Sequence, residues 1–377
     1  MSKPCTGDYP DQAIERDRWI LNLRPERAMI DPWKPRAFLI EEERSESDEV
    51  IRVATVFLAN RECPWRCLMC DLWKDTLTES VPVGAIPAQI DHALSELAGT
   101  QSNVSARAVV PETSAASQSP GWNVRQIKLY NSGSFFDPRA IPIEDYTAIA
   151  DRVTPFERVI VESHPALVGD RCLRFRDLLG ASELKLPRES VSDPSRASSP
   201  QSDAAGGRPR LEVAMGLETA HPEVLEKLNK RMTLRDFAKA AEFLRENDIA
   251  LRVFVLIKPP FLDELESLDW AQRSIRFAFD CGATVVSLIP TRPGNGALDA
   301  LAERGRFSPP KMSTLEAALE HGIGLQRGRV FADLWDLEKF SGCPACFGAR
   351  RSRLNEMNLR QHLTPRIVCG RCQGASR

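Results

Sequence analysis

The stretch Cys-Pro-Trp-Arg-Cys-Leu-Met-Cys at residues 63–70 brings three thiols together in one short loop. It follows residues 51–60 (IRVATVFLAN), an apolar and β-branched run that predicts a buried strand of a parallel sheet. Cysteine thiolates are the usual ligands of iron–sulfur clusters, and three of them leave one iron of a four-iron cluster open. A structural zinc site needs four protein ligands, and the next cysteine along the chain is Cys172. The loop therefore favours a cluster with one open iron, and buried or zinc-binding cysteines are the alternative.

Length and composition are those of a soluble globular protein. Of the 377 residues, 42% are hydrophobic and 27% charged, and the net charge of −2 predicts no general attraction to nucleic acid. No apolar run approaches the roughly 18 residues of a membrane span, and the first residues lack the apolar core of a signal peptide. We therefore expect a cytoplasmic protein without membrane contacts. In that compartment, grouped cysteines indicate metal sites.

Strand and helix patterns alternate along most of the chain, which indicates a parallel sheet with crossover helices. Strands are expected over residues 51–59, 125–130, 158–162, 210–216, 251–257 and 284–289. Helices are expected over residues 86–98, 143–153, 170–179, 234–247 and 264–281. This α/β pattern suits a partial (β/α)6 barrel of the TIM type, although an open doubly wound sheet would have almost the same pattern.

The chain divides into an N-terminal extension that packs on the barrel, the barrel itself and a small basic C-terminal module with four cysteines. We place these segments at residues 1–50, 51–320 and 321–377. The extension is expected to hold a helix over 12–23, a strand near 37–40 and a solvent-exposed acidic turn over 41–49. Two low-complexity insertions, 100–122 and 187–209, are rich in Ser, Ala and Pro and predict disordered or loosely held loops.

Small and acidic residues follow several of the predicted strands. Residues 130–138 (YNSGSFFDP) would let the backbone approach a ligand, with a plain turn as the alternative. Glu162 and Glu218 lie at the carboxyl ends of neighbouring strands, which point toward a barrel mouth. Two carboxylates also suit structural salt bridges or a glycosidase, but a glycosidase would leave the three cysteines without a role.

The C-x3-C-x2-C spacing after a strand resembles the cluster loop of the radical S-adenosylmethionine (SAM) enzymes. The resemblance implies a partial barrel in which Cys63, Cys67 and Cys70 hold a [4Fe–4S] cluster. It further implies that SAM binds the open iron and is cleaved after one electron is transferred, which yields a 5′-deoxyadenosyl radical. The cofactor would supply the reactivity while the protein positions it.

Four segments narrow the resemblance. Residues 215–233 (MGLETAHPEVLEKLNKRMT) resemble the Elongator-type radical SAM core. Together with 60–75 (NRECPWRCLMCDLWKD), 130–138 and 159–165 (VIVESHP), they make the chain similar to the radical SAM subunit of archaeosine synthase and its bacterial relatives. The archaeal subunit acts on a 7-deazaguanine base of tRNA that carries a lysine adduct. The resemblance covers residues 51 to about 290 and implies modification of a tRNA base.

The same resemblance implies which residues contact SAM. They are Met69, Ser132, Gly133, Ser134, Glu162, Glu218 and Lys230. Met69 replaces an aromatic residue that is frequent in the superfamily, and its apolar, polarizable side chain can cover the same face of the adenine. Flavodoxin or ferredoxin is the expected reductant. No catalytic residue is assigned.

The C-terminal module carries a second cysteine group, which consists of Cys343, Cys346, Cys369 and Cys372. Two C-x2-C pairs supply a closed site of four thiolates, which suits zinc or an auxiliary [4Fe–4S] cluster. Residues 347–377 contain seven arginines and a single acid, a net charge of +6. Arginine binds phosphate well, so the module predicts contacts with tRNA, and a solvated basic tail is the alternative. The arginines assigned to tRNA are Arg350, Arg351, Arg353, Arg360, Arg366 and Arg371.

The sequence also allows two other functions. The radical chemistry could act on a small metabolite, with a purely structural C-terminal module. The chain could also be a non-catalytic protein that binds metal and RNA.

Overall fold

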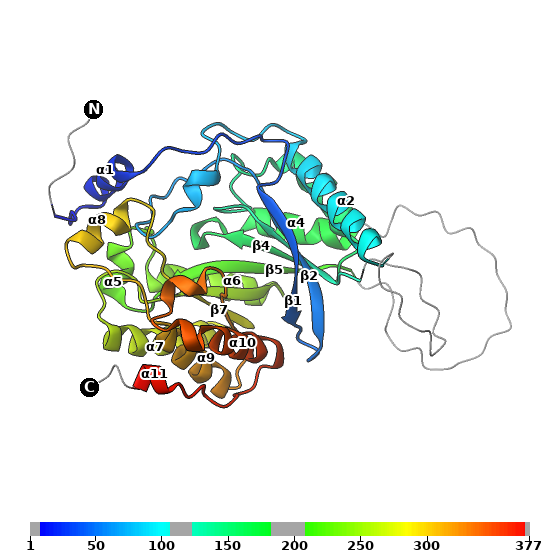
Figure 1. Cartoon of the computed structure of the whole chain (residues 1–377). Coiled ribbons are helices and arrows are strands. Elements are labelled where there is room, and N and C mark those ends of the chain that lie inside the picture. The colour runs from blue at the N-terminus through cyan, green and yellow to red at the C-terminus, as the bar shows by residue number, and fades with distance from the viewer. Residues whose placement is uncertain (1–7, 106–122, 182–207, 374–377) are drawn as a thin grey trace, which may run out of the picture.

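The computed structural model describes residues 8–105, 123–181 and 208–373 (Figure 1). The predicted low-complexity insertions at 100–122 and 187–209 lie largely outside these residues. None of the described helices is long and apolar enough to cross a membrane.

A single sheet of eight strands, ordered β1 to β8 along the chain, forms the centre of the molecule. Strands β2 to β8 are parallel, and β1 pairs antiparallel with β2. The strands are β1 (Ala37–Arg44), β2 (Val50–Phe57), β3 (Gln126–Tyr130), β4 (Arg158–Ser163), β5 (Arg210–Glu218), β6 (Ala250–Ile257), β7 (Val285–Pro290) and β8 (Arg329–Ala332). The predicted α/β barrel-type fold is confirmed, but the number of strands differs. Strand β8 was missed because its four residues are too few to show a period.

The described helices are α1 (Ala13–Leu23), α2 (Ala85–Ser105), α3 (Tyr146–Val153), α4 (Asp170–Ala181), α5 (Pro222–Lys227), α6 (Leu234–Glu246), α7 (Glu264–Asp280), α8 (Ala297–Glu303), α9 (Met312–Gly324), α10 (Pro344–Arg360) and α11 (Gly370–Gln373). Helices α2, α4, α6, α7 and α9 pack on the outer face of the curved sheet, whereas α1 and α8 pack on each other (Figure 1). All the predicted helices are present. Thr233 and Asp236 form a capping box that begins α6, which buries Phe237 and Leu244 toward the sheet as its apolar spacing predicted.

The two faces of the sheet differ in polarity. Alternate residues of β5, such as Leu211 and Val213, join the main hydrophobic core under the helices. The residue between them, Glu212, points to the inner side, where its Oε1 accepts a hydrogen bond from Arg252 Nε at 2.7 Å. The barrel interior is therefore polar around Glu212 and Arg252.

The acidic run 41–49 is not the solvent-exposed turn that the sequence predicted. Its first part belongs to β1, and Glu43 is buried inside the barrel. The Glu43 carboxylate binds Lys128 Nζ of β3 and Arg252 of β6, which hold the pKa of Glu43 well below its usual range. A buried carboxylate needs such partners, and both lie far from it in sequence.

Strands from all three predicted segments share the sheet. Strand β1 comes from residues 1–50 and β8 from residues 321–377, so both flanking segments contribute to the barrel. The division into extension, barrel and C-terminal module stays a prediction.

Candidate cofactor site

The cysteine loop 63–70 follows β2 and lies over the carboxyl end of the sheet. The Leu68 side chain is fully buried against α1 and α8, and its backbone N–H donates to Leu228 O at 2.9 Å. Asn295 Nδ2 donates to Leu68 O at 2.7 Å, and Asn229 Nδ2 donates to Arg66 O at 2.8 Å. These contacts from distant segments hold the backbone of the loop, so the cysteine side chains need not do so. Sequence reasoning missed Asn295.

The three thiols of this loop lie close enough to influence one another. Burial raises the pKa of Cys70 to about 12 and also raises the pKa of Cys63 and Cys67, and mutual charge repulsion adds to the effect on Cys67 and Cys70. The ammonium of Lys230 opposes this effect at Cys67. Desolvated thiols become thiolates when they coordinate a metal. A half-buried triad with only limited cationic support therefore fits a metal-bound group, and the donor set is that of an iron–sulfur cluster.

Gly133 brings the loop of residues 131–134, which we call the small-residue loop, against the cysteine loop. A Cβ at this position would lie 3.1 Å from Cys63 Cβ, which is closer than such contacts normally are. Ser132 adopts a positive φ of 53°, a conformation that costs energy in a non-glycine residue and is found at functional sites. Ser132 and Gly133 thus lie beside the predicted cluster ligands. Ser134 is fully buried, and its hydroxyl lies 3.0 Å from that of Ser163, so it faces the core.

Glu162 holds the small-residue loop in place. Its Oε2 accepts the backbone N–H groups of Asn131 at 2.9 Å and Ser132 at 3.1 Å. Burial raises the pKa of Glu162 to about 7, and these hydrogen bonds act in the opposite direction. The carboxylate therefore has partners within the protein, and its contact with SAM stays a prediction.

Glu218 and Lys230 form a buried ion pair at the carboxyl end of β5. A β-bulge lies between Gly216 and Glu218, and a Cβ on Gly216 would overlap both Glu218 Oε1 and Lys230 Nζ. Only glycine leaves room for the pair. Glu218 has a positive φ of 66°, and the residues on either side of Lys230 also have positive φ. Such strain supports a functional role for this pair.

A stacked pair of rings links the cysteine loop to the barrel. Trp65, between the first two cysteines, stacks on His164 with the ring centroids 3.7 Å apart. Burial lowers the pKa of His164 to about 3, so the imidazole is neutral. Its Nδ1 accepts the N–H of Ala166 at 3.2 Å, and Nε2 therefore donates to Lys230 O at 3.0 Å. The sequence placed Trp65 inside the motif but gave no sign of its partner.

Met69 is partly buried between two hydrophobic clusters. One cluster contains Trp19 and Leu68, and the other contains Leu228 and Leu256. The side chain therefore provides an apolar surface next to Cys70.

Aromatic side chains form a series on the inner side of the sheet, namely Trp335, Phe57, Tyr130 and Phe254. Their ring centroids are 6.1, 6.3 and 6.0 Å apart in that order. Tyr130 and Phe254 belong to β3 and β6, so their contact crosses the interior in front of β4 and β5. Phe57, Tyr130 and Phe254 are partly buried, and Trp335 is 56% exposed. We call these residues the aromatic series.

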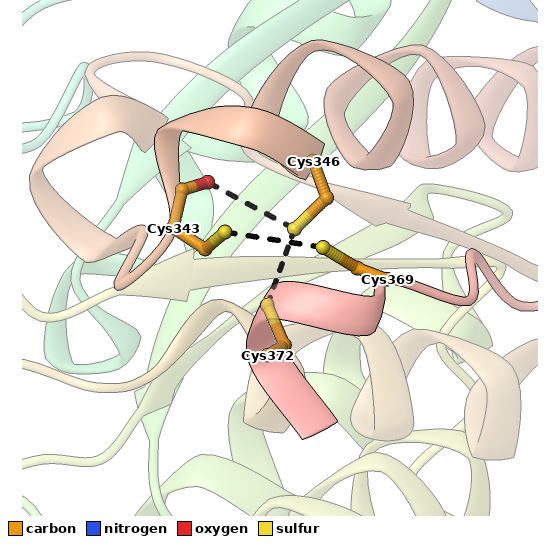
Figure 2. A group of neighbouring side chains, drawn as sticks. All are labelled: Cys343, Cys346, Cys369 and Cys372. Atoms are coloured by element: carbon orange, nitrogen blue, oxygen red, sulfur yellow. Dashed lines mark hydrogen bonds between the residues drawn. The ribbon is translucent and has the colours of Figure 1, made fainter. Parts of the chain in front are cut away.

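The C-terminal cysteine group converges as its spacing predicted (Figure 2). The six arginines assigned to tRNA, however, do not form one free basic surface. Arg350 pairs with Glu316 of α9, and Arg353 and Arg366 both pair with Glu320. Arg360 lies 3.5 Å from Glu356 within α10, whereas Arg351 and Arg371 are exposed. The net charge of the C-terminal segment does not show these pairs, because Glu316 and Glu320 lie on a different helix. Contact between the arginines and tRNA stays a prediction.

No family model matches the chain. It is 25% identical over 272 residues to archaeosine synthase subunit beta of Methanosarcina acetivorans, which covers 69% of this chain and 63% of the relative. It is 28% identical over 188 residues to archaeosine synthase subunit beta of Thermococcus kodakarensis, which covers 49% of this chain and 50% of the relative.

Among solved structures, the radical S-adenosylmethionine methyltransferase TsrM of Kitasatospora setae matches with a TM-score of 0.38 and 14% identity. That match covers 67% of this chain and 39% of TsrM, and a likeness at this level carries no conclusion about function. The sequence similarities agree with the motifs around the cysteine loop: the chain resembles the radical SAM superfamily and is similar to archaeosine synthase subunit beta.

Proposed function

We propose that this chain is a radical SAM enzyme that modifies a tRNA base by archaeosine-type chemistry. The observation that carries the proposal is the meeting of three half-buried thiols, Cys63, Cys67 and Cys70, with the Gly133 loop and the Glu218–Lys230 pair. These groups come from four separate segments and gather at the carboxyl ends of parallel strands, where barrel enzymes hold their active sites.

The three cysteines would hold a [4Fe–4S] cluster. When bound, the cluster and SAM supply a radical able to remove a hydrogen atom from the substrate. Lys230 places a positive charge beside the thiolates, which offsets the negative charge that they carry as ligands. Its ion pair with Glu218 presents both signs of charge in a buried position. The methionine end of SAM is a zwitterion, so a site with both charges suits it.

The loop that contains Ser132 and Gly133 would supply backbone oxygens. Its N–H groups are directed to Glu162. The carbonyl groups of residues 131–133 accept no hydrogen bond within the described part of the chain, so they are free to accept one from the ammonium group of SAM. Met69 would cover the adenine with its apolar side chain.

The aromatic series supports a planar substrate. Base-modifying enzymes commonly take the target base out of its stack, and aromatic side chains bind such bases by stacking. The distribution of arginines gives less support for tRNA, because ion pairs to α9 occupy several of them. That observation favours a second candidate, in which the same chemistry acts on a small planar metabolite.

The experiment that tests the proposal is anaerobic reconstitution with iron and sulfide, followed by dithionite reduction and an assay for 5′-deoxyadenosine. We expect the wild-type protein to form it and Cys67→Ala not to. Cys172→Ala is the matched control, because it removes a buried thiol outside both cysteine groups. Failure of the reconstituted wild type to cleave SAM would refute the proposal.

Added tRNA distinguishes the two candidates. Stimulation of 5′-deoxyadenosine formation by bulk tRNA supports the tRNA substrate. Transfer of a tritium label from the tRNA base to the 5′-deoxyadenosine product would support it further. SAM cleavage that tRNA leaves unchanged supports the small metabolite. A cytoplasmic location and a flavodoxin or ferredoxin reductant stay predictions.

A further inference from the structure

We propose that the C-terminal cysteine group binds a single tetrahedral Zn²⁺ ion, which clasps the C-terminal segment over the open edge of the barrel sheet. This inference concerns a different metal centre from that of the proposed function and does not depend on it. The group consists of Cys343, Cys346, Cys369 and Cys372.

The spacing of the sulfur atoms indicates one ion. The Sγ atoms of Cys343 and Cys369 are 4.0 Å apart, and those of Cys346 and Cys372 are 3.5 Å apart. All four lie within 4.8 Å of one another (Figure 2). Four thiolates at the Zn–S distance of about 2.3 Å form a tetrahedron with edges of about 3.8 Å, which the two measured distances bracket.

A four-iron cluster would need a wider arrangement, because each thiolate then binds a separate iron. The sulfur atoms of Cys63, Cys67 and Cys70 do not approach one another as closely as those of the C-terminal group. Within the described residues, the C-terminal cysteines are the only group of at least three potential ligands whose atoms approach so closely. The chain therefore holds two kinds of cysteine site, and the tight one fits a single ion.

The segment between α10 and α11 lacks an apolar core of its own. Leu363, Ile367 and Val368 are 55%, 39% and 80% exposed. Small modules that bury little apolar surface commonly depend on a metal for their fold. Here the metal ligands lie at the start of α10 and around α11, so one ion ties the C-terminal end of this segment back to the beginning of α10.

Helix α10 covers the seam that the sheet leaves open. It packs against both edge strands, β1 and β8. The Asn358 side chain exchanges two hydrogen bonds of 2.8 Å with the backbone of Ala332, and Gln361 does the same with Val330 at 2.7 and 2.9 Å. The two amides thus pair the backbone edge of β8 as a further strand would.

The position of these two amides in the chain explains how the ion could hold α10 on the edge of β8. Asn358 and Gln361 lie in the last turn of α10 and just after it, directly before the exposed segment. Without the ion, Arg353 and Arg366 would remain as charged anchors, through Glu320 and the backbone of Thr364. Arg366 is exposed, and ion pairs of that kind contribute little. We therefore expect loss of the ion to loosen this end of α10 and to expose the edge of β8.

The first test counts metals in a variant without the loop cysteines, in which Cys63, Cys67 and Cys70 are all replaced by alanine. We expect it to hold one zinc per chain and no iron after reconstitution with iron, sulfide and zinc together. About four irons per chain in that variant would overturn the single-ion assignment.

The second test follows amide hydrogen exchange in the wild type before and after zinc is removed with a strong chelator. We expect exchange at Val330 and Ala332 to rise roughly tenfold or more, with no change at the central strand residues Ile160 and Val213. Cys372→Ser should reproduce this effect, and Cys281→Ser, at the end of α7, should not. Unchanged exchange in β8 after zinc loss would overturn the clasp. No readout involves SAM, so failure here leaves the proposed function untouched.

Discussion

Gly216→Ala tests whether the Glu218–Lys230 pair depends on the space that this glycine leaves. The added Cβ would occupy the position of Glu218 Oε1 and Lys230 Nζ. Both side chains are only 10% exposed, so neither can move into solvent without leaving the buried site. Overpacking costs about 1–3 kcal/mol when the surroundings shift, and breaking a buried ion pair costs about 3–5 kcal/mol. We expect a loss of at least about 1 kcal/mol in unfolding free energy.

The assay is urea unfolding, with the shift of the midpoint compared at an unchanged slope, together with SAM binding by calorimetry. Gly348→Ala is the matched control. It lies inside α10 with nothing within 4 Å of the added Cβ, and it should raise stability by about 0.5–1 kcal/mol because alanine favours the helix. Wild-type stability and wild-type SAM affinity in Gly216→Ala would refute the reasoning.

Three further predictions follow from contacts in the site. Trp65→Leu removes the stack on His164 and should lower iron per chain after reconstitution, whereas Trp65→Phe should keep most of it; equal iron in both variants would contradict a positioning role. Glu162 has a folded pKa of about 7, above its ordinary value, so the folded state binds its proton more tightly than the unfolded state, and this group should reduce stability as the pH rises from about 4.5 to 7. Glu162→Gln should lose that pH dependence. If the unfolding free energies of the two proteins change in parallel between these pH values, Glu162 does not cause the dependence. Tyr130→Leu and Phe254→Leu should weaken substrate binding and leave substrate-independent SAM cleavage intact; loss of SAM cleavage in both would show that the aromatic series serves the cofactor.

Much of the fold was predictable because its signals are local. The strand before the cysteine loop, the crossover helices and the strand near residues 37–40 all have patterns that a short window contains. Strand β8 was missed, since its four residues show no period. The spacing of the cysteines predicted two groups, and the C-terminal group does converge.

Partnerships between distant residues could not be predicted in this way. Glu43 belongs to an acidic run that suggested a solvent-exposed turn, yet it binds Arg252, 209 residues away, inside the barrel. Arg353 belongs to a basic segment that suggested RNA, yet it binds Glu320 of α9.

The sequence by itself determined the chemical character of the site, because ligand type and loop spacing are local properties of the chain. Tertiary structure alone decided which charges remain free, because a charge is neutralised by whatever the fold brings within a few ångströms of it.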